Sequence, residues 1–259
     1  MPFGTGEEFL IAEVQELLRQ GHEVLIFPRS PKAKIVNQDA LTFERITVRE
    51  SVLNPRILAG ACLEMIHRPL ATVQALGLLL EDMSPAVFLK NLAVFPKGLW
   101  LSRLARQWRA DHIHVQWGLT TATMAMVAGH VSRLAWSMTL HRGDIASPNL
   151  LASKVGRARF TRFISESGRR MAHSRGRLSS SARSVVIHMG VALPDDNPPW
   201  SPLRHPFVIL CPAQLSPVKG HRYLIDALAI LRDTGFRVEL LLAGEGCLRQ
   251  GLAEQVEAL

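Results

Sequence analysis

The segment PAQLSPVKGH, residues 212–221, lies between an apolar run and an amphipathic run. The run before it, FVILC at 207–211, has the length and composition of a buried strand. After it, Leu224, Leu228 and Leu231 recur at helical spacing, which predicts a helix over residues 221–232. Lys219 therefore belongs to a strand-to-helix loop, where backbone amides and the helix dipole favour an anionic ligand. The segment predicts a phosphate or diphosphate site.

The same order of strand and helix recurs along the chain. Helices are expected at 7–20, 122–131 and 248–258, and strands at 24–27, 112–117, 135–140, 160–165, 185–187 and 238–242. Residues 55–109 are expected to be helical, broken by Pro69, Pro85 and Pro96. This alternation predicts an α/β fold with parallel sheets. We expect a Rossmann-like N-terminal domain at 1–196, a linker at 197–204 and a partial second Rossmann-like domain at 205–259.

Composition limits the class of protein. The chain has 259 residues, of which 47% are hydrophobic, enough for a buried core. It has neither an apolar run as long as a membrane span nor a secretory leader pattern. Its cysteines, Cys62, Cys211 and Cys247, are far apart, which argues against a disulfide framework or a zinc site. We expect a cytoplasmic protein, peripheral at the inner face of the membrane if its basic segments attach it there.

Positive charge is concentrated in residues 154–183. This segment contains nine basic residues and one acidic residue, Glu166, so its net charge equals the +8 of the whole chain. Such a patch attracts anionic lipids and phosphorylated substrates. Phe160 and Phe163 have the spacing of core residues in a strand, not of a base-stacking surface, so no nucleic-acid partner is expected. A solvated arginine-rich surface is an equally good interpretation.

Residues 86–109 combine an apolar stripe with interspersed lysines and arginines. Phe88, Leu92, Phe95 and Leu99 repeat at helical spacing. A basic amphipathic helix of this kind can lie on an anionic membrane surface. The alternative, which we favour, is a helix that covers the N-terminal sheet.

Five segments, in order along the chain, resemble the retaining GT-B glycosyltransferases of family 4. GTGE at 4–7 with GHEV at 21–24 is similar to the opening glycine loop and turn of that family. Three further segments resemble parts of the N-terminal domain of that family: a strand (DHIHVQW at 111–117), a turn (TLHRGDI at 139–145) and the last strand (VIHMGV at 186–191). Residues 215–231 with LAGEG at 242–246 are similar to the core of its nucleotide-sugar domain. The resemblance covers nearly the whole chain.

The resemblance implies a GT-B-like fold and the transfer of a sugar from a nucleotide-sugar donor to an acceptor hydroxyl with retention. Polysaccharide or glycolipid assembly, with a sugar or lipid-linked acceptor, is the expected setting. Lys219 would contact the diphosphate, His141 would lie near the transferred sugar and Asp144 beside the acceptor path. The remaining donor-binding positions would be Gln214, Gly4, Gly6, Gly244 and Gly246. No metal or cofactor is expected, because basic side chains and helix N-termini stabilise the leaving diphosphate in this family.

The chain also departs from the family pattern. Gln214 stands where the family has an arginine, and losing one charged contact to the developing anion costs about 2–4 kcal/mol. Ala192 replaces the usual aspartate. The first strand and the later pair of glutamates have no counterpart, so we expect a chain truncated at both ends. A second hypothesis is therefore a non-catalytic fragment or degenerate paralogue that acts as a binding module.

Each candidate also has a structural interpretation. Lys219 could belong to an ordinary surface loop, His141 could be a strand-end histidine bonded to backbone, and Asp144 could cap a turn. His112 and His114 face one side of a strand, but no third ligand has suitable spacing, so a structural role is favoured over a metal site. A nucleotide-dependent oxidoreductase is a third hypothesis. It is weakened because Phe9 occupies the third glycine position of a dinucleotide fingerprint.

Overall fold

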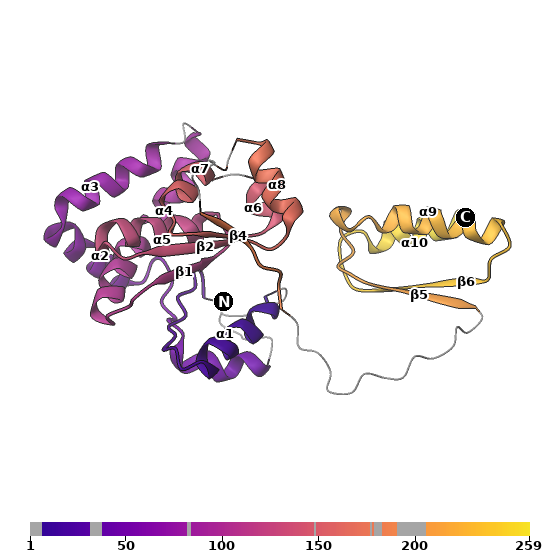
Figure 1. Cartoon of the computed structure of the whole chain (residues 1–259), viewed down its shortest axis with the longest axis horizontal. Helices are drawn as coiled ribbons and strands as arrows, with labels where there is room; N and C mark the ends of the chain where they lie inside the picture. Colours follow the sequence, from indigo (N-terminus) through magenta and orange to yellow (C-terminus); the bar gives the residue numbers. More distant parts are fainter. Residues whose placement is uncertain are drawn as a thin grey trace. The chain divides into compact units, whose positions relative to one another are not determined.

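The computed structural model describes residues 7–31, 38–81, 84–147, 149–176, 178, 183–190 and 206–259. The chain divides into two compact units, Met1–Leu193 and Pro194–Leu259. Figure 1 shows the elements of each unit. The expected linker at 197–204 lies outside the described residues, as do Gly4 and Gly6.

A four-stranded parallel sheet forms the centre of the first unit. Its strands are β1 (Ile113–Gln116), β2 (Trp136–Leu140), β3 (Thr161–Phe163) and β4 (Ser184–Val186), and they lie side by side in chain order. Parallel neighbours need a crossover, and helices supply each one. These are α5 (Thr120–Ser132), then α6 (Arg142–Ala146) with α7 (Leu151–Arg157), then α8 (Glu166–Ser174). The predicted parallel α/β architecture is confirmed for this unit.

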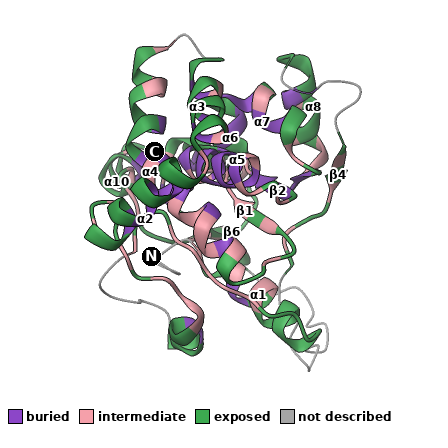
Figure 2. Cartoon of the chain, turned by 90° about the vertical axis from the view of Figure 1, so that its left-hand side faces the viewer, coloured by how far each residue is buried: buried purple, intermediate pink, exposed green. Residues whose placement is uncertain are grey.

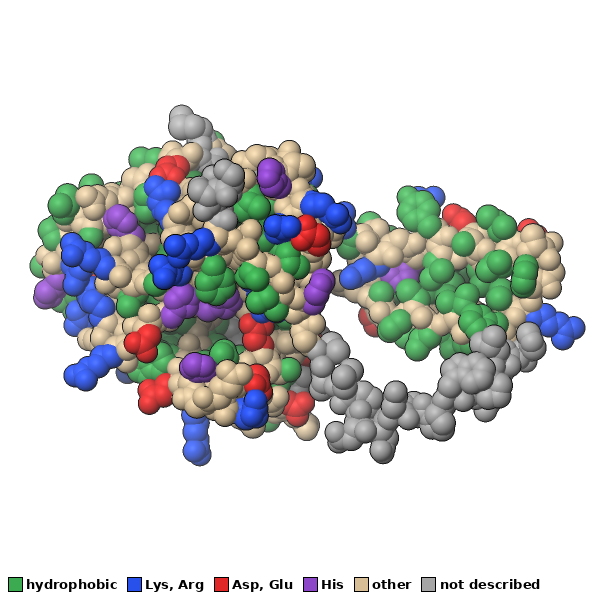
Figure 3. All heavy atoms as spheres, in the orientation of Figure 1, with side chains coloured by type: hydrophobic (Ala, Val, Ile, Leu, Met, Phe, Trp, Pro, Cys, Tyr) green, Lys and Arg blue, Asp and Glu red, His purple; other side chains and the backbone are tan. Residues whose placement is uncertain are grey.

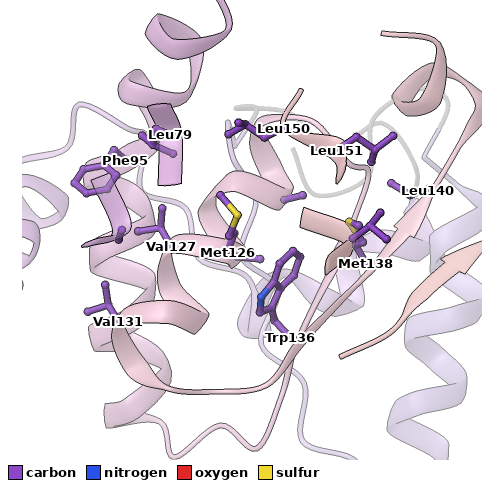
Figure 4. Packing of buried hydrophobic residues seen from close by; sticks show 14 of the residues in the cluster. Leu79, Phe95, Met126, Val127, Val131, Trp136, Met138, Leu140, Leu150 and Leu151 are labelled. Carbon is purple, nitrogen blue, oxygen red and sulfur yellow. The ribbon is translucent and has the colours of Figure 1, made fainter. Parts of the chain in front are cut away.

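The main core lies between this sheet and α5. Trp136, Met138 and Leu140 alternate along β2 toward the helix, where Met126 of α5 lies, whereas Val127 faces Phe95 of α4 (Figure 4). Helix α5 is buried along nearly its whole length because α4 packs on its other side. A helix between two layers has little solvent face, so α5 consists mainly of small and apolar residues and carries no Asp, Glu, Lys or Arg.

Three helices build the outer layers of this unit. Helices α2 (Pro55–His67), α3 (Pro69–Leu78) and α4 (Pro85–Gln107) each begin with a proline, and the short turn η2 (Leu79–Glu81) precedes α4. Pro69 and Pro85 therefore start helices, as expected for a residue without an N–H at the first position. The predicted break at Pro96 was wrong, because α4 continues through it. Among the described residues, no helix is long and apolar enough to cross a bilayer.

The N-terminal part of the unit departs from the prediction. Helix α1 (Phe9–Arg19) is present, but residues 24–27 form no strand and make a single parallel bridge, Ile26 to Thr47. A 3₁₀ segment, η1 (Gln38–Ile46), packs against α1. A strand needs a partner to satisfy its backbone groups, and among the described residues only Ile26 pairs in this way.

Lys97 of α4 anchors this N-terminal part. Its side chain is fully buried, and Nζ donates to the carbonyl oxygens of Pro28 (2.7 Å), Arg29 (3.0 Å) and Glu50 (2.7 Å). Burial lowers the pKa of Lys97 to about 8, and the nearby Glu50 opposes the shift. The ammonium group thus satisfies three carbonyls that belong to two separate segments of chain.

The second unit is a pair of β–α repeats. Parallel strands β5 (Phe207–Pro212) and β6 (Val238–Ala243) form a separate two-stranded sheet. Helices α9 (His221–Asp233) and α10 (Arg249–Glu257) follow them, and the turn η3 (Pro217–Lys219) leads into α9. Leu215, Ile225 and Leu252 form its core, with Leu240 and Leu242 packed against them. The predicted strands and helices of this region are confirmed, but β5 is not the buried strand that its apolar run predicted: Phe207, Val208 and Leu210 are exposed.

Candidate functional site

The candidate residues fall at the carboxyl ends of parallel strands, where open α/β sheets bind ligands. His141 directly follows β2 in the first unit, with Asp144 one turn later in α6. In the second unit, Gln214 and Lys219 follow β5, and Gly244 and Gly246 follow β6. The residues thus form two groups, one in each unit.

His141 lies in an aromatic cluster. Its ring is 5.6 Å from that of Trp117, in a stacked orientation, and 5.5 Å from that of Phe9 in α1. The Nε2 atom is buried and has no hydrogen-bond partner among the described residues. Burial lowers the pKa of His141, with the Asp144 charge opposing. Burial therefore favours the neutral form of the ring, and Nε2 has unmet hydrogen-bonding capacity.

Asp144 has a structural partner. Its Oδ2 accepts the backbone N–H of His141 at 2.8 Å, which fixes the turn between β2 and α6. The residue is 3% exposed, and desolvation raises the pKa of its carboxyl, against hydrogen bonds from the backbones of His141 and Gly118. This carboxylate holds the histidine backbone in place. It offers little surface to an acceptor.

A buried lysine holds the loop after β1 in place. Trp117 has a φ of 68°, in the left-handed region, and the buried Lys154 donates to the carbonyl oxygens of Gly118 (3.0 Å) and Leu119 (2.8 Å). Asn149 accepts a third bond from this ammonium group at 3.0 Å. A non-glycine residue with positive φ is strained and persists only where its surroundings hold it. Lys154 therefore helps to keep the Trp117 ring against His141.

Polar side chains line one face of the sheet. Ser137 Oγ is 2.7 Å from both His112 Nε2 and His114 Nδ1, and His114 Nε2 is 2.9 Å from Thr139 Oγ1. Desolvation lowers the pKa of His112, and it lowers the pKa of His114 to about 4. Both histidines are bonded to neighbouring hydroxyls, which agrees with the structural role favoured from the sequence.

In the second unit, Lys219 is exposed and forms no ion pair among the described residues. It ends the turn η3, and Gly220, with a φ of 73°, makes the sharp entry into α9. Gln214 is exposed in the same loop. The loop thus presents one free ammonium group and one neutral amide beside the N-terminus of a helix.

Two polar side chains in this loop have unmet hydrogen-bonding capacity. His221, the first residue of α9, is 1% exposed, and neither ring nitrogen has a partner among the described residues. The buried Ser216 Oγ also has none. Unpaired buried polar groups are rare because each costs about 1–3 kcal/mol. The sequence prediction gave neither residue a role, although both flank the lysine that it selected.

Gly244 and Gly246 bring two loops into close contact. A methyl group on Gly244 would collide with the carbonyl oxygen of Ala213, and one on Gly246 with that of Leu215. Leu215 N–H donates to Glu245 O at 3.0 Å across the same junction. A cavity of about 560 Å³ opens beside it, with Gly244, Glu245 and Arg249 in its lining. These glycines shape the loop that carries Gln214.

Many side chains of the two basic segments, residues 86–109 and 154–183, are buried or hydrogen-bonded within the first unit. In α4, Phe95, Leu99 and Lys97 are buried, so its stripe faces the core. In residues 154–183, several basic side chains bond to other groups of the protein: Lys154, Arg157, Arg162, Arg169 and Arg175. Attachment of these two segments to an anionic surface stays a prediction.

No protein-family model matches the chain, and no curated protein matches its sequence. The resemblance to GT-B transferases therefore rests on the residues described above.

Proposed function

We propose that this protein is a retaining, GT-B-like glycosyltransferase of the family 4 type, acting in polysaccharide or glycolipid assembly. It would move a sugar from a nucleotide-sugar donor to an acceptor hydroxyl. Parallel sheets in both units support the proposal, because the selected residues then gather at the carboxyl ends of strands.

The observation that carries the proposal is the loop around Lys219. An exposed ammonium group without a carboxylate partner precedes the N-terminus of α9, and the unpaired Ser216 and His221 side chains flank it. Helix N-termini bind phosphate groups through free N–H donors and the helix dipole. A diphosphate could accept hydrogen bonds from the Lys219 ammonium group and the N-terminal amides of α9; the Ser216 hydroxyl and the His221 ring are buried beneath them.

In the first unit, the His141 cluster is suited to a sugar. The flat faces of Trp117 and Phe9 can pack against the C–H groups of a sugar ring. The neutral His141 ring can exchange a hydrogen bond with a sugar hydroxyl through Nε2. In the proposed reaction, the bond from the anomeric carbon to the diphosphate oxygen breaks and a bond to the acceptor oxygen forms. The acceptor hydroxyl loses its proton, and the nucleoside diphosphate leaves.

The test is donor binding and turnover by Lys219→Ala. We expect wild-type protein to bind UDP- or GDP-sugars, and the variant to lose about 10²- to 10³-fold in kcat/KM. Arg237→Ala is a matched control, because Arg237 is exposed and precedes β6 at the opposite end of the strands. Absence of nucleotide binding by wild-type protein, or equal loss in both variants, would contradict the proposal.

A binding module without turnover is the second candidate. Two residues favour a binding module. Gln214 is uncharged, and the buried Asp144 carboxylate already accepts the His141 N–H. The same assay separates the two functions, since a module of this kind binds nucleotide sugar but releases no nucleoside diphosphate. Gln214→Arg would then increase donor affinity.

A further inference from the structure

Strand β5 has one free edge. Strand β6 pairs with it on one side, and among the described residues no strand pairs with it on the other. Figure 2 shows burial concentrated on α5 and β2 of the first unit, whereas β5 has no buried residue. Val208 and Leu210 are 46% and 61% exposed. The part of the chain that the structure describes thus leaves both this edge and its apolar side chains uncovered.

The unpaired backbone groups of this edge belong to Val208 and Leu210. Phe207 N–H donates to the carbonyl that precedes β6 (2.9 Å), and Ala213 N–H donates to the last carbonyl of β6 (3.0 Å). Residues at odd positions of β5 thus face β6. Because strand residues alternate in direction, the N–H and C=O groups at 208 and 210 point to the free edge. Pro212, the next residue on that side, has no N–H to satisfy.

Nothing in the sequence of β5 discourages pairing at this edge. Natural edge strands are commonly protected by charged side chains, especially Lys, by Pro or by β-bulges. The sequence FVILCP has no charged residue, and its proline is the last residue of the strand. The edge is thus a ready template for another strand.

The edge is also complementary to itself. In an antiparallel pair with Ile209 of one copy opposite Ile209 of the other, Val208 lies opposite Leu210 on both sides of the centre. Each Val208–Leu210 pair exchanges two N–H···O=C bonds, so the four outward N–H groups of the two strands each find a carbonyl. Pro206 and Pro212 then lie opposite each other and end the pairing, since neither has an N–H.

We propose that β5 pairs with β5 of a second copy of this chain, antiparallel about Ile209, and joins two β5–β6 sheets into one sheet of four strands. A two-fold interface uses the same edge of both chains, so it closes at two copies. A second copy fits this edge better than a peptide of another sequence, because the chain's own prolines bound the stretch in which every outward N–H is paired. Figure 3 shows hydrophobic side chains gathered on the second unit, and across each pair Val208 would pack beside Leu210. This proposal does not depend on the glycosyltransferase activity.

Two double variants at the exposed positions 208 and 210 test the pairing by analytical ultracentrifugation of the full chain. Wild-type protein should sediment as a dimer in equilibrium with monomer. Val208→Lys with Leu210→Lys places two lysines opposite each other in both pairs, so the dissociation constant should rise about 10-fold or more. Val208→Glu with Leu210→Lys is the matched control. It removes the same apolar groups but places a carboxylate opposite each ammonium group, so it should dimerise about 10-fold more tightly than the Lys/Lys variant.

Val208→Pro tests the backbone part. It removes one outward N–H from each chain and leaves the N–H groups that bond to β6 in place, so it should weaken the dimer about 10-fold. The proposal is overturned if wild-type protein stays monomeric near its solubility limit, or if it forms assemblies larger than two chains. It is also overturned if the Lys/Lys and Glu/Lys variants dissociate alike, because the charges would then not lie opposite each other.

Discussion

Arg162 and Glu13 form an ion pair that joins helix α1 to strand β3 across 149 residues of sequence. Nη1 of the arginine is 3.0 Å from both carboxylate oxygens, and its Nε and Nη2 donate to the carbonyl oxygens of Ile187 and His188. One side chain therefore ties together α1, β3 and the end of β4.

Arg162→Met should lower the free energy of unfolding by about 2–4 kcal/mol, because the partly buried Glu13 carboxylate loses its charged partner and keeps only the donation from Gln116, and two carbonyls lose a donor. Urea denaturation at pH 7 measures the change. Arg169→Met is the control: its pair with Glu166 lies on the surface, and its loss should cost less than about 0.5 kcal/mol. Similar losses in both variants would show that the pair does not hold α1 to the sheet.

Lys97→Met should destabilise the first unit by about 2–4 kcal/mol, since three carbonyl oxygens on two segments lose the buried ammonium group that joins them. Lys90→Met, an exposed lysine on the same helix, should change stability by no more than about 0.5 kcal/mol. Hydrogen exchange should also speed up at Ile26 and Val48, whose N–H groups bond across the tethered segments. Unchanged exchange there would contradict the anchoring role.

Gly244→Ala and Gly251→Ala should have opposite effects on the second unit. The first places a methyl group against the Ala213 carbonyl and should destabilise by about 1–3 kcal/mol. The second adds a methyl group to open space within α10 and should stabilise by about 0.5–1 kcal/mol. Thermal unfolding of the two variants measures both signs. A stable Gly244 variant would mean that the two loops can separate at little cost.

His141→Gln tests the proposed site in the first unit. We expect turnover to fall about 10²-fold or more while nucleotide affinity stays the same, since the loop proposed to bind the diphosphate belongs to the other unit. His173→Gln is the control, because His173 is exposed on α8. A matching loss of nucleotide affinity in His141→Gln would instead place this ring in donor binding.

Stability should fall on acidification. Folding lowers the pKa values of His112, His114 and His141, and that of His114 reaches about 4 from an ordinary 6.5. Between pH 6.5 and 4 the unfolded chain therefore binds more protons, so the free energy of unfolding decreases as the pH falls through this window. Part of the His114 ring faces water, so we expect about 1–2 kcal/mol from this residue. His114→Gln should flatten the slope in urea titrations across this range. An unchanged slope would refute the assignment.

The sequence predicted helices and strands well where a short apolar run lies between turn residues. The run at 207–211, the loop and the helix that follows all formed, although Phe207, Val208 and Leu210 of the strand are exposed and not buried as expected. Residues 24–27 had the same apolar character but found only one backbone partner, Ile26 with Thr47. Strand formation depends on a distant partner, which local pattern does not reveal.

The site was predicted less completely. Lys219 and His141 could be selected because a resemblance marked them, and each lies at the carboxyl end of a strand. Nothing in the sequence distinguishes Lys97, whose side chain is fully buried, from the exposed Lys90 on the same helix. The unpaired ring of His221 depends on tertiary packing in the same way.

Helix α5 has a consequence for how the molecule assembles. It lies between the sheet and α4, and its face toward α4 fits closely because Gly98 leaves room for Val127. Until the sheet and α4 have packed on it during folding, the hydrophobic surface of α5 is exposed and can associate with other chains. Aggregation should therefore compete with refolding, and the yield of refolded protein should fall steeply as its concentration rises.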